Sequence, residues 1–368
     1  MENRDIRRLR RFAQRSDAKS VKAERAAIRK LEEERHALKR LRREYQKRMG
    51  EVFYDPRWAD LFGDNKFVLI DVGAQGGLEK EWRKVRPLLK VMAVEPRTKL
   101  GEGLTDADFE VTILNVALDS QSGERELYLA ASMSSFLRPD LQVCNQFGFN
   151  PKTPMERSRV KTTTLDEIVK NQQLRFVDFI KLDTQGTELD IIRGGMMTIS
   201  EMAVAMRVEV SFCRLYESQP LFGDVDAYVR PQGFDFIDLM HFVRRRHVWT
   251  GAADKTAVQV ADGQLLQADA LYFRTPARVK TQLEKFTGAD RIRYMAGVLV
   301  ACLTYGKLDL AARCIHDASS LIEPISRAVM LELLRCAVPR NQPSGTLSEL
   351  TRKSGRFWRN VSWLGVVF

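Results

Sequence analysis

The sequence predicts an α/β protein built on a parallel β-sheet with helices on its faces. The first observation is the stretch Phe67-Val-Leu-Ile-Asp-Val-Gly-Ala-Gln-Gly-Gly77, where an apolar run is followed by a glycine-rich turn and then by helical spacing over 78–85. The second is that short apolar runs alternate with helical patterns from residue 67 to residue 274. This alternation is typical of parallel strands joined by helical crossovers. Ligands of such sheets bind at the carboxyl ends of the strands.

The individual elements follow from apolar runs, turn residues and caps. The expected strands are 67–70, 91–95, 109–118, 126–130, 176–183, 203–212, 234–241 and 269–274. Helices are expected over 78–85, 162–171 and 189–193, and loop and helix over 216–229. Residues 131–160 contain several Ser and Pro and are expected to be irregular. A loop of this length inside a compact domain is usually functional or mobile.

Composition excludes several classes of protein. The chain has 368 residues and is 44% hydrophobic, enough for one large domain with appendages or for two domains. It has no run of 18 apolar residues and begins with charged residues, so we expect neither a membrane-spanning helix nor a secretory signal. Its five cysteines lack C-x-x-C spacing and its four histidines lack metal-ligand spacing. We therefore predict a cytoplasmic protein without a metal site.

The basic charge is concentrated at the N-terminus. Residues 1–49 hold 18 Lys/Arg against 8 Asp/Glu, a net of +10 in a chain of net +11. They lack Pro and Gly, and a thin apolar seam at Leu31, Leu38 and Tyr45 predicts a long helix. Two interpretations stay open. One is a solvated arm or a coiled coil, which could form a homodimer. The other is an arm that contacts an anionic partner, such as an acidic glycan or the inner membrane surface. Nucleic acid is disfavoured because few aromatics accompany the charges.

The C-terminal part reads as an extension. Residues 277–340 have the three-to-four spacing of stacked helix pairs, and the tail from Lys353 mixes basic and aromatic residues. That tail either packs on the protein or lies in a membrane interface. The expected organisation is a basic helical arm (1–49), an α/β domain that carries the function (50–276) and a helical extension with its tail (277–368).

The glycine turn is the first candidate ligand site. Its glycines let backbone N–H groups approach a ligand closely. About 20 residues later the second strand ends in Glu95, the position where dinucleotide folds hold ribose hydroxyls with a carboxylate. The pattern is D-x-G-x-x-x-G and not G-x-G-x-x-G, which suits S-adenosylmethionine better than NAD. A glycine turn without any cofactor is the competing interpretation. Four acids, Asp71, Glu95, Asp183 and Glu209, end predicted strands and favour a ligand site.

Eight motifs, in a matching order and spacing over about 200 residues, carry a family resemblance. They are IDVGAQGG at 70–77, AVEPR at 93–97, LNVALDSQSGERELYL at 114–129, TTLDEIV at 163–169, FIKLDTQGTELDIIRGG at 179–195, VEVSFCRLYESQPLF at 208–222, GFDFIDL at 233–239 and ADALYFR at 268–274. Residues 66–275 thereby resemble the FkbM-type S-adenosylmethionine-dependent methyltransferases. The sequence departs from the family by placing Gln185 where Glu is usual and Gln75 where Asn is usual.

The resemblance implies a doubly wound, Rossmann-like class I methyltransferase fold with seven strands, mostly parallel. It implies methyl transfer to oxygen, commonly on a sugar hydroxyl of a glycan, glycolipid precursor or natural product. The residues expected to bind S-adenosylmethionine are Asp71, Gly73, Ala74, Gln75, Gly77, Glu95, Pro96 and Asn115.

A sugar hydroxyl is a poor nucleophile, so a positioned group should take its proton. The candidates are Asp183 first, then Glu188, Glu209 and His241. Asp183 could instead cap the following helix by accepting from a backbone N–H.

Two other functions compete with this one. The first is a methyltransferase-like module without activity that binds or scaffolds other proteins in glycan assembly. The second is a nicotinamide oxidoreductase, which the missing G-x-G-x-x-G disfavours.

Overall fold

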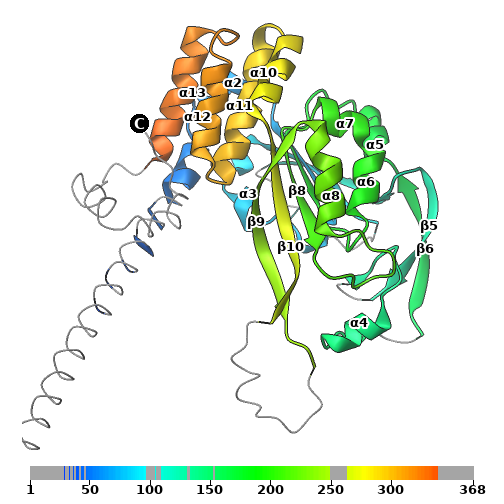
Figure 1. The fold of residues 1–368 in the computed structure, drawn as a ribbon. Helices are drawn as coiled ribbons and strands as arrows, with labels where there is room; N and C mark the ends of the chain where they lie inside the picture. The colour runs from blue at the N-terminus through cyan, green and yellow to red at the C-terminus, as the bar shows by residue number, and fades with distance from the viewer. Residues whose placement is uncertain are drawn as a thin grey trace, which may run out of the picture.

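The computed structural model shows a central seven-stranded sheet with helices on both faces (Figure 1). It describes residues 29, 33, 36, 39–40, 43–44, 47–96, 104, 109–130, 133–151, 154–248 and 263–338. The strand order is β3-β2-β1-β7-β8-β10-β9. The strands are β1 (Phe67–Val72), β2 (Leu89–Val94), β3 (Glu110–Leu114), β7 (Phe179–Leu182), β8 (Ala205–Ser211), β9 (Phe234–Arg245) and β10 (Gln264–Arg274).

The sheet is mostly parallel, as predicted. The pairs β3/β2, β2/β1, β1/β7 and β7/β8 are parallel, whereas β10 is antiparallel to both β8 and β9. Strands β1, β2 and β7 therefore end side by side at one edge of the sheet. Since β1 and β2 come first in the chain and β7 far later, this adjacency collects distant segments at one place.

A second, smaller sheet differs from the prediction. The expected strand 109–118 is divided into β3 and β4 (Ala117–Leu118), and β4 joins β6 (Glu156–Thr163) and β5 (Gly123–Leu129) in a three-stranded sheet. Residues 131–160 were expected to be irregular but contain α4 (Leu141–Gln146) and most of β6. The α4 helix begins where the Asp140 carboxylate accepts the N–H of Val143 at 3.1 Å. That is a side-chain cap.

The helix predicted over 78–85 is shorter in the structure. Only α3 (Lys80–Arg83) is α-helical, between the 3₁₀ turns η1 (Ala74–Gly76) and η2 (Arg86–Leu88). Trp82 is fully buried against Phe67 and Phe179, at ring distances of 5.5 and 4.8 Å. Packing of this one ring, rather than helix length, fixes the segment.

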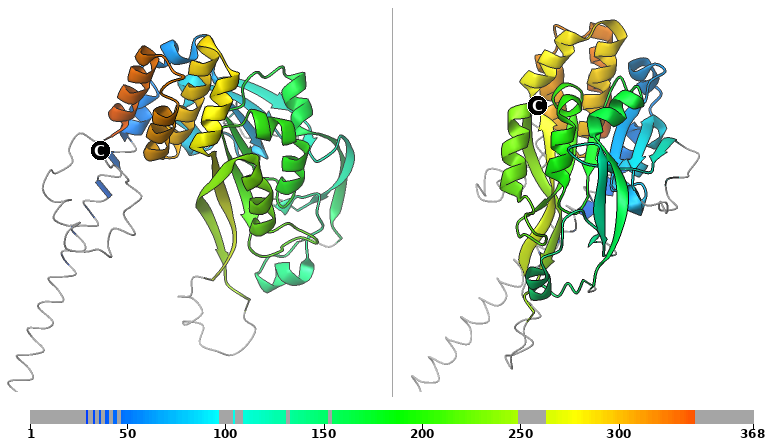
Figure 2. Two further views of the ribbon diagram at one scale, coloured as in Figure 1. Left: turned by 45° about the horizontal axis from the view of Figure 1, so that its top comes forward. Right: turned by 90° about the vertical axis from the view of Figure 1, so that its right-hand side faces the viewer.

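Each face of the sheet has its own apolar core. Phe67 and Leu69 of β1 face one core, and Val68, Ile70 and Val72 face the other. A strand buried on both faces reads as a continuous apolar run, which is why β1 was predictable. The first face carries α2 (Trp58–Phe62), α3, α10 (Pro276–Lys285), α11 (Gly288–Thr304), α12 (Leu308–Asp317) and α13 (Pro324–Ala337) (Figure 2). The second carries α5 (Leu165–Asn171), α6 (Glu188–Gly194), α7 (Met196–Glu201) and α8 (Phe222–Val229).

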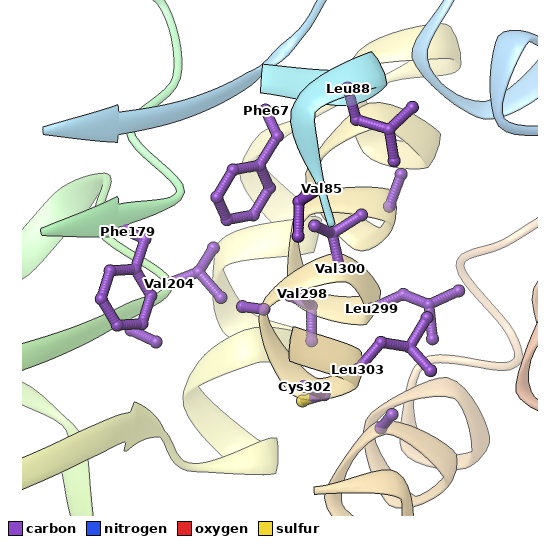
Figure 3. Packing of buried hydrophobic residues seen from close by; sticks show 14 of the residues in the cluster. Phe67, Val85, Leu88, Phe179, Val204, Val298, Leu299, Val300, Cys302 and Leu303 are labelled. Atoms are coloured by element: carbon purple, nitrogen blue, oxygen red, sulfur yellow. The ribbon is translucent and has the colours of Figure 1, made fainter. Parts of the chain in front are cut away.

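The C-terminal helices share their core with the sheet. Val298, Leu299 and Leu303 of α11 lie in one cluster with Phe67 and Phe179 (Figure 3). At the other end of α11, the Arg293 guanidinium donates to both carboxylate oxygens of Asp178, at 2.7 and 2.6 Å. Both side chains are at most 2% exposed. Helices α10–α13 are thus packed as a layer of the α/β domain. The predicted bounds of the extension stay a prediction.

The arm and the tail are largely outside the described residues. Residues 47–52 are helical, and Met49 is 1% exposed in the core cluster, so the chain joins the core within the range predicted as the arm. The tail of 353–368 lies outside the described residues. Within the described part, no helix is long and apolar enough to cross a membrane.

Candidate functional site

A pocket of about 310 Å³ opens at the carboxyl ends of β1, β2 and β7. It lies where such sheets bind their ligands. Its volume is at the lower end of the range for small-molecule sites, roughly 300–1,000 Å³. The lining residues are Val72, Gly73, Gln75, Gly76, Val94, Glu95, Pro96, Val116, Ala117, Leu118, Leu127, Ser134, Phe136, Asp183, Thr184, Gln185 and Thr187.

Gly73 gives the turn after β1 its shape. Its φ of 81° lies in the left-handed region, and its N–H donates to the carbonyl of Val94 at 3.0 Å. A Cβ at this position would collide with the backbone carbonyl oxygen of Asp183. Glycine is therefore required both for the backbone conformation and for the close approach of the β7 end. The turn and the end of β7 form one continuous wall of the pocket.

Glu95 and Pro96 close the neighbouring wall. Glu95 follows β2 and is only 3% exposed, and its N–H donates to Leu114 on β3 at 3.1 Å. The strand pairing β1/β2 places this carboxylate beside the glycine turn. A carboxylate held there by both neighbouring strands can accept hydrogen bonds from a ligand's hydroxyl groups.

Not all predicted cofactor residues reach the pocket. Gly73, Gln75, Glu95 and Pro96 line it. Asp71, Ala74, Gly77 and Asn115, all within the described part of the chain, lie outside the lining. Asn115 is exposed in the loop after β3, and its neighbours Val116, Ala117 and Leu118 line the pocket instead.

Asp71 is buried on the α11 side of the sheet, beneath the turn. Its carboxylate lies 3.2 Å from Nζ of Lys181, which also approaches Glu79 at 3.6 Å and Asp183 at 3.5 Å. Burial raises the pKa of Asp71, and the charge of Lys181 offsets part of that effect. Burial opposes the charge of Lys181, but the carboxylates around it outweigh burial and raise its pKa. Asp71 is thus paired with Lys181 beneath the pocket and does not line it.

The turn after β7 separates the roles of two acids. The backbone N–H groups of Thr184 and Gly186 donate to the Glu188 carboxylate, at 2.8 and 3.0 Å. Burial raises the pKa of Glu188 to about 7, although these backbone donors favour its ionised form. The Glu188 carboxylate thus holds the backbone of the turn that precedes α6, while Thr187, at the cap position of α6, makes no side-chain cap hydrogen bond. Asp183 lines the pocket with its side chain 39% exposed.

Glu209 lies near the end of β8, within hydrogen-bonding distance of Gln185. It accepts from the Gln185 amide, whose Nε2 is 3.0 Å from Oε2 of Glu209 and 3.4 Å from Oδ1 of Asp183. Burial, followed by the charges of Asp183, Glu188 and Asp269, raises the pKa of Glu209 well above its ordinary value. Glu209 therefore binds a proton more readily than an exposed glutamate does.

His241 is held away from the pocket lining. It sits at a β-bulge of β9 with φ 52°, Nδ1 is 2.8 Å from Asp269, and Nε2 is 3.8 Å from Glu81. The hydrogen bond with Asp269, and then that with Glu81, raises the pKa of His241 to about 9. An imidazole that is protonated at neutral pH cannot accept a proton, which argues against His241 as the base.

Sequence reasoning missed most of the apolar wall and all of the segment around Phe136. Ser134 and Phe136 line the pocket, and the Ser135 hydroxyl donates to the carbonyl of Gln185 at 2.7 Å. The unusual length of the predicted loop 131–160 was the only signal that pointed to this segment. Val116, Ala117 and Leu118 could have been found from the apolar run that continues past β3.

The pocket fits a nucleoside ligand with a polar tail. Apolar side chains from 116–118, Leu127 and Phe136 offer faces for a flat ring, Glu95 offers acceptors for hydroxyls, and Gly73 lets a ligand approach the backbone. Within the described residues, no group of three or more His, Cys, Asp or Glu is arranged to hold a metal ion.

Comparisons with known proteins identify the family that this part of the chain matches. Residues 71–236 match the family model of the methyltransferase FkbM domain, which confirms the family predicted from the motifs and supports methyltransferase activity. A crystal structure of methyltransferase FkbM from Methylobacillus flagellatus KT is 15% identical, covers 57% of this chain and has a TM-score of 0.30. This chain covers 45% of that protein, and a similarity at this level carries no argument about function. No curated protein matches the chain.

Proposed function

Because residues 71–236 match the methyltransferase FkbM domain, we propose that this protein is an S-adenosylmethionine-dependent O-methyltransferase acting on a sugar hydroxyl of a glycan, glycolipid precursor or natural product. The observation that carries the proposal is that Gly73, Glu95 and Asp183, from the ends of three adjacent strands, line one pocket. Gly73 permits close approach of a ligand to the backbone, Glu95 offers acceptors for hydroxyl groups, and Asp183 is an accessible carboxylate.

In this proposal, different residues bind the cofactor and take the proton from the acceptor. S-adenosylmethionine, when bound, supplies a methyl group that its sulfonium already activates. The chain has to hold the acceptor hydroxyl in attack geometry and take its proton. Asp183 is the proton acceptor in this proposal, because its carboxylate lines the pocket, is 39% exposed and lies 3.5 Å from Lys181. Glu95 would hold the ribose hydroxyls of this cofactor, and the backbone of the Gly73 turn would hold its amino-acid tail.

Calorimetry with S-adenosylmethionine and, separately, with NADH tests the cofactor. We expect binding of the first only, and a Glu95→Ala affinity about 10- to 100-fold weaker, since unpaired hydroxyls in a closed pocket cost about 1–3 kcal/mol. Glu110→Ala is the matched control, because Glu110 lies on the adjacent strand β3 with its side chain 60% exposed. Binding of NADH alone would support the oxidoreductase instead. Equal affinities in the two variants would remove Glu95 from the site.

Turnover on a panel of mono- and oligosaccharides, with a methyl-labelled donor, separates the enzyme from a silent binding module. On the acceptor that wild type methylates, Asp183→Asn should lower turnover by about 10²–10⁴, the usual share of general-base catalysis. The melting temperature should barely change, since Glu188 and not Asp183 holds the backbone of the turn. Near-normal turnover by Asp183→Asn would exclude Asp183 as the base. Cofactor binding without any turnover would favour the module.

A further inference from the structure

Gln185 has an unusual backbone in the turn between β7 and α6. Its φ is 61°, a left-handed conformation that is uncommon in non-glycine residues. Here the Ser135 hydroxyl binds its carbonyl at 2.7 Å, and its side chain is held from β8 and from Tyr216. The strained residue lies in the pocket lining, next to the candidate base.

Every hydrogen-bonding group of the Gln185 amide is directed at a named partner. Nε2 carries two hydrogens and faces Glu209 at 3.0 Å and Asp183 at 3.4 Å. Oε1 lies 3.2 Å from the Tyr216 hydroxyl. Burial, followed by the charge of Glu209, raises the pKa of Tyr216, so its hydroxyl keeps its hydrogen. Rotating the amide would turn its oxygen toward two carboxyl groups, so the observed orientation is the one that the neighbours impose.

The two carboxyl groups that share this amide are unlike each other. Asp183 reaches the pocket and is paired with Lys181, whereas Glu209 is half-buried on β8 and lies near the charges of Asp183, Glu188 and Asp269. Carboxyl groups this close repel when both are charged and otherwise share a proton. A neutral donor placed between them, with one N–H for each, relieves that repulsion without adding a charge.

We propose that Gln185 is a positioning residue for the reaction: its amide bridges Asp183 and Glu209 and holds the Asp183 carboxyl group in place at the pocket. The bridge itself needs no ligand, but its part in catalysis rests on the proposed function. A glutamate at this position would have no N–H to offer. It would place a further carboxyl group 3.0–3.4 Å from the other two and force the cluster to take up a proton.

The test compares Gln185→Glu with Gln173→Glu. Gln173 is the matched control because it also has a positive φ, 51°, but is exposed in a loop outside the pocket lining. Both variants exchange an amide for a carboxyl of the same shape. Melting temperatures establish that each is folded.

The first readout is a pH titration of carboxyl carbons by NMR, in ¹³C-Asp/Glu-labelled protein without any ligand. Asp183→Asn and Glu209→Gln assign the two resonances. In Gln185→Glu, the titration midpoints of Asp183 and Glu209 should move up by about one pH unit or more, and in Gln173→Glu they should stay in place. Midpoints that move no further in Gln185→Glu than in the control would overturn the bridge.

The second readout is kcat/KM against pH on the sugar that wild type methylates. The acid limb of the Gln185→Glu profile should move up by the same amount as the NMR titration midpoint of Asp183. A shifted titration with an unshifted rate profile would overturn the positioning role. Failure of wild type to bind S-adenosylmethionine would instead refute the proposed function, while the titration still decides whether the bridge exists.

Discussion

The buried pair of Arg293 and Asp178 gives the sharpest prediction about stability. In Arg293→Met the Asp178 carboxylate loses two donors, at 2.7 and 2.6 Å, and keeps the Val68 N–H at 2.7 Å. The carbonyl of Lys66 also loses its donor at 2.6 Å. Because Asp178 is 1% exposed, water cannot replace the lost partners. Breaking such a pair from one side costs about 3–5 kcal/mol. That is a large share of a total stability of about 5–15 kcal/mol.

Urea unfolding followed by tryptophan fluorescence measures this loss, since Trp58 and Trp82 are both buried. The double variant Arg293→Met/Asp178→Asn should recover part of it, because no unpaired charge then remains. Arg313→Met is the control: its ion pair with Asp317 leaves the arginine side chain 68% exposed. It should change the unfolding free energy by less than about 1 kcal/mol. An Arg293→Met protein as stable as Arg313→Met would refute the reasoning.

Two further predictions concern pH and the N-terminal arm. The pKa of His241, about 9, exceeds its ordinary value of 6.5. Protonation of His241 therefore stabilises the folded state. This contribution is complete below pH 6.5 and disappears as the pH rises through 9. Wild type should therefore exceed His241→Gln in urea midpoint at pH 6 and lose that advantage by about pH 10; a pH-independent difference would contradict this. Deleting 1–46, which spares the buried Met49, should leave calorimetric S-adenosylmethionine affinity unchanged and weaken salt-sensitive binding to anionic vesicles. A loss of cofactor affinity would show that the arm supports the site.

The inner strands β1, β2, β7 and β8 of the large sheet were predictable because burial on both faces leaves an almost uninterrupted apolar run. In the small sheet, β5 was predicted in part as the strand 126–130, but β6 was not, because it reads ERSRVKTT and only Thr162 of it is buried. Its pairing with β5 runs residue by residue from Gly123↔Thr162 to Leu129↔Glu156 through backbone hydrogen bonds. Such pairing leaves no apolar pattern in the sequence.

For the functional site, single residues were predictable from the sequence but their arrangement in space was not. Gly73, Glu95 and Asp183 were predictable one at a time, because each follows an apolar strand. Their arrangement in one pocket depends on β7 lying beside β1, and sequence spacing alone does not contain that adjacency. The bridge through Gln185 needs Glu209 from β8 and Tyr216 from the loop beyond it, so only the folded chain reveals it.

The short α3 helix is held in place by the side chains around it, several of them charged. Four residues are too few for a helix to be stable on its own. The segment is instead fixed by Trp82 in the core, by Glu79, which pairs with Lys181 and Arg207, and by Glu81, which faces His241. Lys181 also contacts Asp71 below the turn and Asp183 in the pocket. The same lysine therefore joins Asp71, near the end of β1, to the candidate base Asp183 at the end of β7.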